Sequence, residues 1–110
     1  MAVVEQTIDV GGLSTSNLTV YTAPAGSTSS SRITALSVHA QGGRDQLEVY
    51  LVRSGDSVSA SNIIYDRAIA EGETKSIPLV NQTLKDGDYL VLRAVTGSIL
   101  NIKGTIKEVS

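Results

Sequence analysis

The sequence lacks cysteine, tryptophan and phenylalanine altogether, and it has no excess of basic residues. Without cysteine, the 110 residues cannot form a disulfide framework or a zinc site built from thiolates. The 9 basic and 11 acidic side chains leave a formal net charge of −2. Because nucleic-acid binding by electrostatics needs a basic excess, we expect no nucleic-acid partner.

Long apolar segments are also missing. No stretch approaches the roughly 18 uninterrupted apolar residues of a membrane span, so we expect no membrane partner. The N-terminal residues MAVVEQTIDVGG lack the basic flank and apolar stretch of a signal peptide, which predicts synthesis in a cytoplasm without secretory export. Hydrophobic residues still make up 41% of the chain, enough for one packed domain.

The residues that are abundant are those of β-strands. Short runs rich in Val, Ile, Leu, Thr and Tyr alternate with turns rich in Gly, Ser and Asp, and no window shows helical periodicity. This pattern predicts eight strands, at residues 3–10, 17–22, 32–40, 46–53, 62–70, 73–79, 89–95 and 98–109.

Eight short strands at this spacing predict an all-β fold, an antiparallel β-sandwich of about eight strands. The sandwich could be jelly-roll-like or immunoglobulin-like, because alternation does not encode strand order. We expect an N-terminal arm or first strand at residues 1–12 and a single β-sandwich domain at 13–110. The Asp86-Gly87 pair predicts a hairpin turn between residues 85 and 88.

Alternation with period two predicts which side chains line the interior. Three strands each carry one apolar face, formed by Leu47, Val49 and Leu51, by Leu90, Leu92 and Ala94, and by Leu100, Ile102, Gly104 and Ile106. In the third strand Leu36, Val38 and Ala40 share a face, which places Ile33 and Ala35 on the opposite one. That second apolar face, like Val91 and Val95, predicts contact with another element or another chain.

Candidate catalytic and metal-binding groups are sparse. Ser37 and His39 share a strand face, but such neighbours point in parallel, and no G-x-S-x-G elbow is present. The carboxylates of Glu71-Gly72-Glu73 and Asp86-Gly87-Asp88 could supply part of a calcium shell, yet turn formation is the favoured role. We therefore predict no catalytic residue, no cofactor, no metal site and no enzymatic activity.

Interface residues are the remaining candidates. Tyrosine is favoured at protein interfaces because it buries a large area at low entropic cost, although packing at the core edge is equally compatible with each tyrosine here. The N-terminal stretch precedes a Gly11-Gly12 hinge and could serve as a docking or strand-exchange arm. The interface candidates are Val3, Val4, Tyr21, Tyr50, Tyr65 and Tyr89.

Several turns and strands together resemble a known group. The matching segments are TVYTAPAG from Thr19 to Gly26, SRITALSVHAQGG, LEVYLV, the turns at Glu71-Gly72-Glu73-Thr74 and Asp86-Gly87-Asp88, and the closing TGSILNIKGTIKEV. This succession, from about residue 15 to the end, resembles small β-sandwich virion accessory proteins of tailed bacteriophages. Gln41 stands where the group usually has Asn.

The resemblance implies a capsid decoration or cement protein. Such a protein is a non-enzymatic structural component on the virion capsid surface, made in the bacterial host cytoplasm. Its implied partners are further copies of itself, expected as a homotrimer, and the major capsid protein. The alternative is a tail-fibre or baseplate module that binds a host-surface glycan, although the chain shows no heptad shaft segment and has only four tyrosines as sugar platforms.

Overall fold

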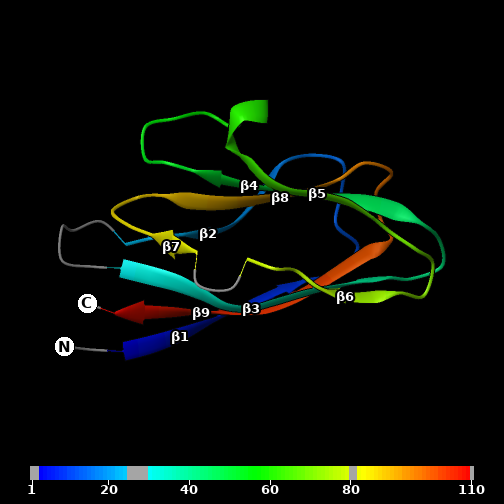
Figure 1. Cartoon of the computed structure of the whole chain (residues 1–110), viewed down its shortest axis with the longest axis horizontal. Coiled ribbons are helices and arrows are strands. Elements are labelled where there is room, and N and C mark those ends of the chain that lie inside the picture. Colours follow the sequence, from blue (N-terminus) through cyan, green and yellow to red (C-terminus); the bar gives the residue numbers. More distant parts are fainter. Residues whose placement is uncertain (1–2, 25–29, 80–81, 110) are drawn as a thin grey trace.

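Two antiparallel sheets pack face to face in the computed structural model, which describes residues 3–24, 30–79 and 82–109 (Figure 1). Sheet A consists of β1 (Val3–Val10), β9 (Leu100–Val109), β3 (Ser30–Ala40), β6 (Thr74–Ser76) and β7 (Thr83–Leu84). Sheet B consists of β2 (Leu18–Thr22), β8 (Tyr89–Ala94), β4 (Asp45–Val52) and β5 (Ile63–Ile69). The described residues contain no α-helix, and a 3-10 turn, η1 (Ala60–Asn62), precedes β5. The predicted all-β sandwich is confirmed.

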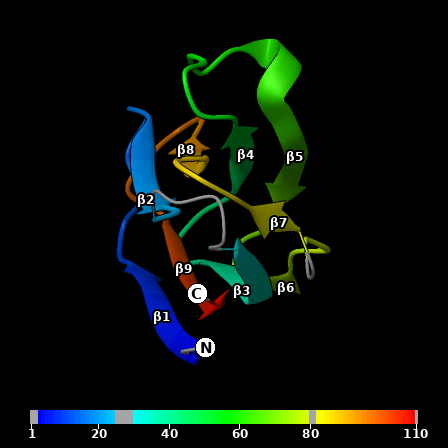
Figure 2. The ribbon, with the colours of Figure 1, turned by 90° about the vertical axis from the view of Figure 1, so that its left-hand side faces the viewer.

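The strand order identifies the sandwich as a jelly roll. Sheet A runs β1-β9-β3-β6, with β7 also paired to β3, and sheet B runs β2-β8-β4-β5 (Figure 2). If β6 and β7 are counted as one interrupted strand, this is the order of an eight-stranded jelly roll. The chain crosses between the sheets at nearly every connection, whereas β4 and β5 form a hairpin within one sheet.

Two local predictions were wrong for reasons of topology and backbone chemistry. Asp86 and Gly87 do form a turn with positive φ values of 45° and 89°. However, this turn joins β7 in sheet A to β8 in sheet B, so it is not a hairpin. The strand predicted at residues 73–79 ends at Ser76, two residues before Pro78, which has no N–H to donate to a strand ladder.

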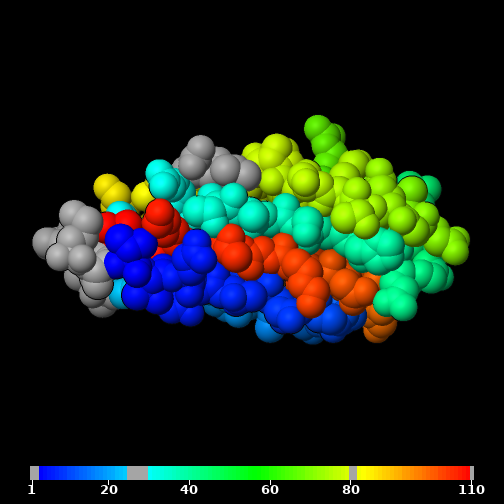
Figure 3. Space-filling view, turned by 90° about the horizontal axis from the view of Figure 1, so that it is seen from below, coloured from blue at the N-terminus to red at the C-terminus, as the bar shows by residue number. Residues whose placement is uncertain are grey.

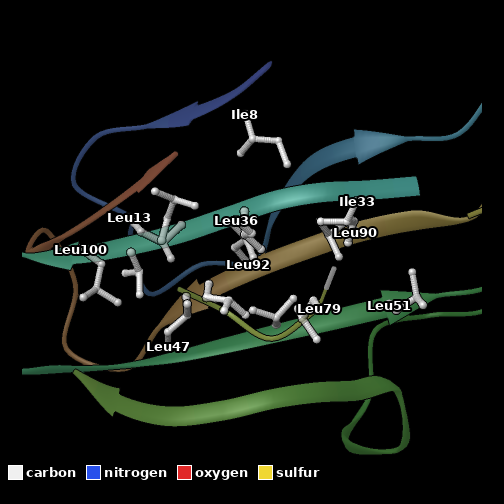
Figure 4. Packing of buried hydrophobic residues seen from close by; sticks show 14 of the residues in the cluster. Ile8, Leu13, Ile33, Leu36, Leu47, Leu51, Leu79, Leu90, Leu92 and Leu100 are labelled. Carbon is white, nitrogen blue, oxygen red and sulfur yellow. The ribbon is translucent and has the colours of Figure 1, made fainter. Parts of the chain in front are cut away.

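The core is aliphatic and contains the three predicted apolar faces. Leu47, Leu90 and Leu92 are fully buried in it, and Leu79 enters it from the interruption between β6 and β7 (Figure 4). Val49, Ile77 and Ile102 are buried in the same cluster. Burying a side chain of this kind contributes roughly 1.5–3 kcal/mol. Many branched side chains therefore fill the core, in which the described residues place no tryptophan or phenylalanine.

A bulge in β3 changes the predicted orientation of one residue. Ile33 pairs with Ile106 and Ala35 pairs with Thr105, so Thr34 is an extra residue in the ladder. The extra residue reverses the alternation on its N-terminal side, and Ile33 is fully buried in the core while Ala35 is exposed. The prediction that Ile33 lies on the outer face was wrong, because period two does not continue through a bulge.

The outer face of sheet B has a small buried apolar pair of its own. Val52 and Val91 are buried, yet they lie outside the core cluster between the sheets. Val91 pairs with Thr19 on one side and with Tyr50 on the other. Contact of Val91 with neighbouring elements of the same chain is thus confirmed, whereas Val95 remains 43% exposed just beyond β8.

Next to this bulge, β9 has a position where only glycine fits. A Cβ added to Gly104 would lie 2.6 Å from the Ala35 carbonyl oxygen and 2.8 Å from Leu36 Cδ1. We predict that Gly104→Ala lowers the free energy of unfolding by about 1–3 kcal/mol through overpacking, as measured by urea denaturation. Gly11→Ala is the control, because its new Cβ would come no closer than 3.9 Å to Asn101 Oδ1. Equal stabilities of the two variants would contradict the prediction.

Candidate interaction surfaces

A charged network covers the outer face of sheet B. Arg93 on β8 donates from Nη1 to Glu48 Oε1 on β4 at 2.6 Å, and from Nε to the Thr15 carbonyl at 2.8 Å. The Tyr50 hydroxyl donates to the same Glu48 oxygen at 3.0 Å. Glu48, Tyr50 and Arg93 therefore hold one another in place on this face. Burial, followed by the hydrogen bond to Glu48, raises the pKa of Tyr50.

A polar clasp joins the two sheets at the end of the sandwich that holds the start of β3. Tyr21 on β2 donates its hydroxyl to Glu108 Oε2 on β9 and also contacts Ser31 Oγ on β3 at 2.6 Å. Gln6 on β1 donates to Glu108 Oε1 at 3.1 Å. Burial, followed by the Glu108 hydrogen bond, raises the pKa of Tyr21 to about 12, so the hydroxyl keeps its proton at neutral pH.

Two buried carboxylates organise turns. Asp45 accepts hydrogen bonds from the backbone N–H groups of Gln46, Thr96 and Gly97 at 2.7, 2.7 and 2.8 Å. Burial alone would raise the pKa of Asp45, but these three donors outweigh it and lower the pKa below its ordinary value. Asp88 is held in the same way by the backbone of Lys85 and Ser54 and by Arg53 Nη1 at 2.7 Å.

Ser37, His39 and Glu73, three further candidates for chemistry, also have structural partners. His39 Nδ1 contacts Thr74 Oγ1 at 2.8 Å, whereas Ser37 Oγ donates to the Lys103 carbonyl at 3.4 Å, so the structure does not couple the two side chains. Glu73 Oε1 accepts the Ala70 N–H at 2.9 Å, which is a turn contact. Within the described ranges, no three His, Cys, Asp or Glu residues gather as a metal site would require.

The four tyrosines proposed as interface residues are all half-buried. Tyr21 and Tyr50 belong to the clasp and to the sheet B network, and the Tyr89 hydroxyl donates to the Asp56 carbonyl at 2.7 Å. Tyr65 packs against the core from β5 and lines an open hollow of about 370 Å³ with Ile63, Asp66, Arg67 and Pro78. Their contact with a partner stays a prediction.

The two valines proposed as interface residues are the most exposed large apolar side chains among the described residues. Val3 and Val4 on β1 are 54% and 47% exposed, and Val95 and Leu18 follow at 43% and 40%. Sequence reasoning did not single out Leu18, nor the Glu48–Arg93 ion pair. Cross-strand partners such as these become visible only when the strand order and register are known.

Comparisons with known proteins support the fold. No protein-family model and no curated sequence matches the chain. Among solved structures, one similar chain comes from Bacillus endospore appendages, which form a novel family of disulfide-linked pili. It is 8% identical, with a TM-score of 0.59 over 98% of this chain and 88% of that one. At this identity the likeness shows a shared fold.

Two viral chains match more weakly. A chain of infectious bursal disease virus, Gx strain, is 15% identical with a TM-score of 0.44, and a mutant VP2 protein of that virus in T=1 particles is 14% identical with the same score. Each match covers 96% of this chain but only 28% and 31% of the viral chains.

No helix in the described part of this chain is long and apolar enough to cross a membrane.

The Asp45 turn leads to a prediction about acid stability. Because folding lowers the pKa of Asp45, its stabilisation is present above the ordinary aspartate pKa near 3.9 and is lost as the pH falls through the folded-state value. Asp45→Asn should therefore cost about 2 kcal/mol of unfolding free energy at pH 7, and the difference from wild type should shrink in acid. Denaturation at pH 7 and below pH 4 measures both effects.

The exposed Asp56 provides the control for this experiment. Asp56→Asn makes the same chemical change where no N–H is held, and we expect a change within about 0.5 kcal/mol. An Asp45→Asn effect that stayed constant with pH would show that the carboxylate charge is not what stabilises the turn.

Proposed function

We propose that this chain is a non-enzymatic structural subunit that decorates or cements the capsid of a tailed bacteriophage, through self-association and binding to the major capsid protein. The observation that carries the proposal is that the buried polar groups of the described residues are hydrogen-bonded within the chain itself. The carboxylates of Asp45, Asp88 and Glu108 are bound within turns or between sheets, and in the described residues no buried side-chain N or O atom lacks a partner.

A rigid scaffold of this kind suits assembly. Its polar groups stabilise the fold, while exposed apolar residues, Val3 and Val4, lie on an edge strand where another chain can reach them. The likeness to a pilus chain over nearly its whole length also supports a building-block role. Those pili are disulfide-linked, whereas these 110 residues contain no cysteine, so we expect the contacts of this chain to be noncovalent.

One observation favours the alternative of a tail-fibre or baseplate module. The hollow beside β5 is lined by Tyr65, Asp66 and Arg67, which could offer a ring face and polar groups to a host-surface glycan. The hollow is open, and Tyr65 is the one tyrosine in it, so we rank this function second.

Copy number in purified virions of the phage that encodes the chain distinguishes the two functions. A decoration protein should be present at a copy number comparable to that of the major capsid protein, and it should bind purified capsids that lack it. Quantitative gel densitometry and a capsid co-sedimentation assay measure these properties. A tail-like copy number, or a failure to sediment with capsids, would reject capsid decoration.

A further inference from the structure

The four edges of the sandwich differ in how well they are protected against pairing with another strand. Exposed edges attract foreign strands, and proteins usually guard them with short strands, bulges, proline or lysine. In β2, which has five residues, Val20 is an extra residue in the ladder with β8. In β5, Ile64 is an extra residue in the ladder with β4. Both edges of sheet B are therefore irregular.

The two edges of sheet A contrast sharply. On one side β6 has three residues and β7 has two, with Pro78 between them. On the other side β1 pairs with β9 without a register shift over eight residues, from Val3↔Val109 to Val10↔Ile102. Strand β1 contains no proline, lysine or bulge, and Figure 3 shows it as an uninterrupted band along one side of the sheet.

The side chains of β1 are also left uncovered. Ile8 is the one buried residue of the strand, and Val3 and Val4 are about half exposed on its two faces. Each carboxylate on β1 lies opposite a lysine of β9 in the register: Asp9 is bonded to Lys103 at 2.7 Å, and Glu5 faces Lys107. The charge of Asp9 is thus compensated within the sheet, whereas Glu5 has Lys107 only as its register neighbour.

We propose that β1 pairs antiparallel with β1 of a second copy, so that the two A sheets become one continuous sheet. The occupant is a second copy because a two-fold contact requires only one free edge, used by both partners, and β1 is the regular one. This inference rests on the proposed assembly role. The predicted dimer differs from the homotrimer that the phage resemblance implies. A closed trimer needs two different complementary surfaces on each copy, whereas a two-fold dimer uses the same edge of both copies.

Charge excludes several registers of the pair, and the length of the ladder decides between the others. Registers that place Glu5 opposite Glu5 or opposite Asp9 of the second copy set like charges directly across from each other, which is unfavourable. Of the registers that avoid this, the one with Gln6 on the two-fold axis pairs the longest part of β1, residues 3–9 of both copies. It places the exposed Val4 opposite Ile8 of the second copy. Glu5 then lies opposite the uncharged Thr7 and Asp9 opposite Val3, so no like charges face each other.

The absence of cysteine from the chain allows a direct test of this register. In a Gln6→Cys variant, the two new thiols would lie opposite each other, at a Cα separation of about 4.5–5.5 Å that suits a disulfide. We expect most of the oxidised variant to run as a covalent dimer on a non-reducing gel. Ser76→Cys, on the interrupted opposite edge, is the control and should stay monomeric. Equal crosslinking of both variants, or none of Gln6→Cys, would overturn the proposal.

A second experiment tests the edge without a disulfide. Val3→Lys with Val4→Lys adds charge at two exposed positions, so the fold should survive while the dimer dissociation constant rises at least about tenfold. Leu18→Lys on β2 is the matched control and should leave the dimer unchanged. Light scattering and circular dichroism measure mass and folding. A wild-type monomer or trimer, or a dimer insensitive to the β1 charges, would refute the pairing while leaving capsid binding to be judged by its own assay.

Discussion

The ladder between β3 and β9 is the contact on which the rest of the sandwich depends. It runs from Ser30↔Val109 to Ala40↔Leu100 and joins the first third of the chain to its end. β1 pairs with the other side of β9, and β6 and β7 pair with the other side of β3, so sheet A exists only once this ladder has formed. The close approach of Ala35 to Gly104 and the bulge at Thr34 set its geometry.

That ladder also places the inter-sheet clasp. Ser31 and Glu108 are register partners in it, and both reach Tyr21 on sheet B. The packing of an aliphatic core is less directional than hydrogen bonding, because hydrophobic side chains of similar volume can often replace one another. Hydrogen bonds such as these, together with the Asp45 and Asp88 turns, add directional contacts that favour one arrangement of the two sheets.

Most of the polar contacts described above bind the chain to itself. Groups that bind turns and strands together contribute to rigidity, and rigidity is what a building block of an assembly needs. What the fold leaves uncovered is an edge strand with exposed valines, whose backbone groups can pair with another strand. In the proposed assembly role, the edge of sheet A is the surface that meets a partner.

Composition and alternation determined the all-β class, seven of the strand positions and the inward faces of β4, β8 and β9, because period two is a local property of the chain. Val3 and Val4 could be proposed as interface residues from their place before the Gly11-Gly12 hinge. The tertiary structure alone decided the jelly-roll order, the burial of Ile33 behind a bulge, the crossing of the Asp86-Gly87 turn between sheets, and the pairing of Glu48 with Arg93. Each of these features depends on which distant strands become neighbours. The local pattern of side chains carries no information about that pairing.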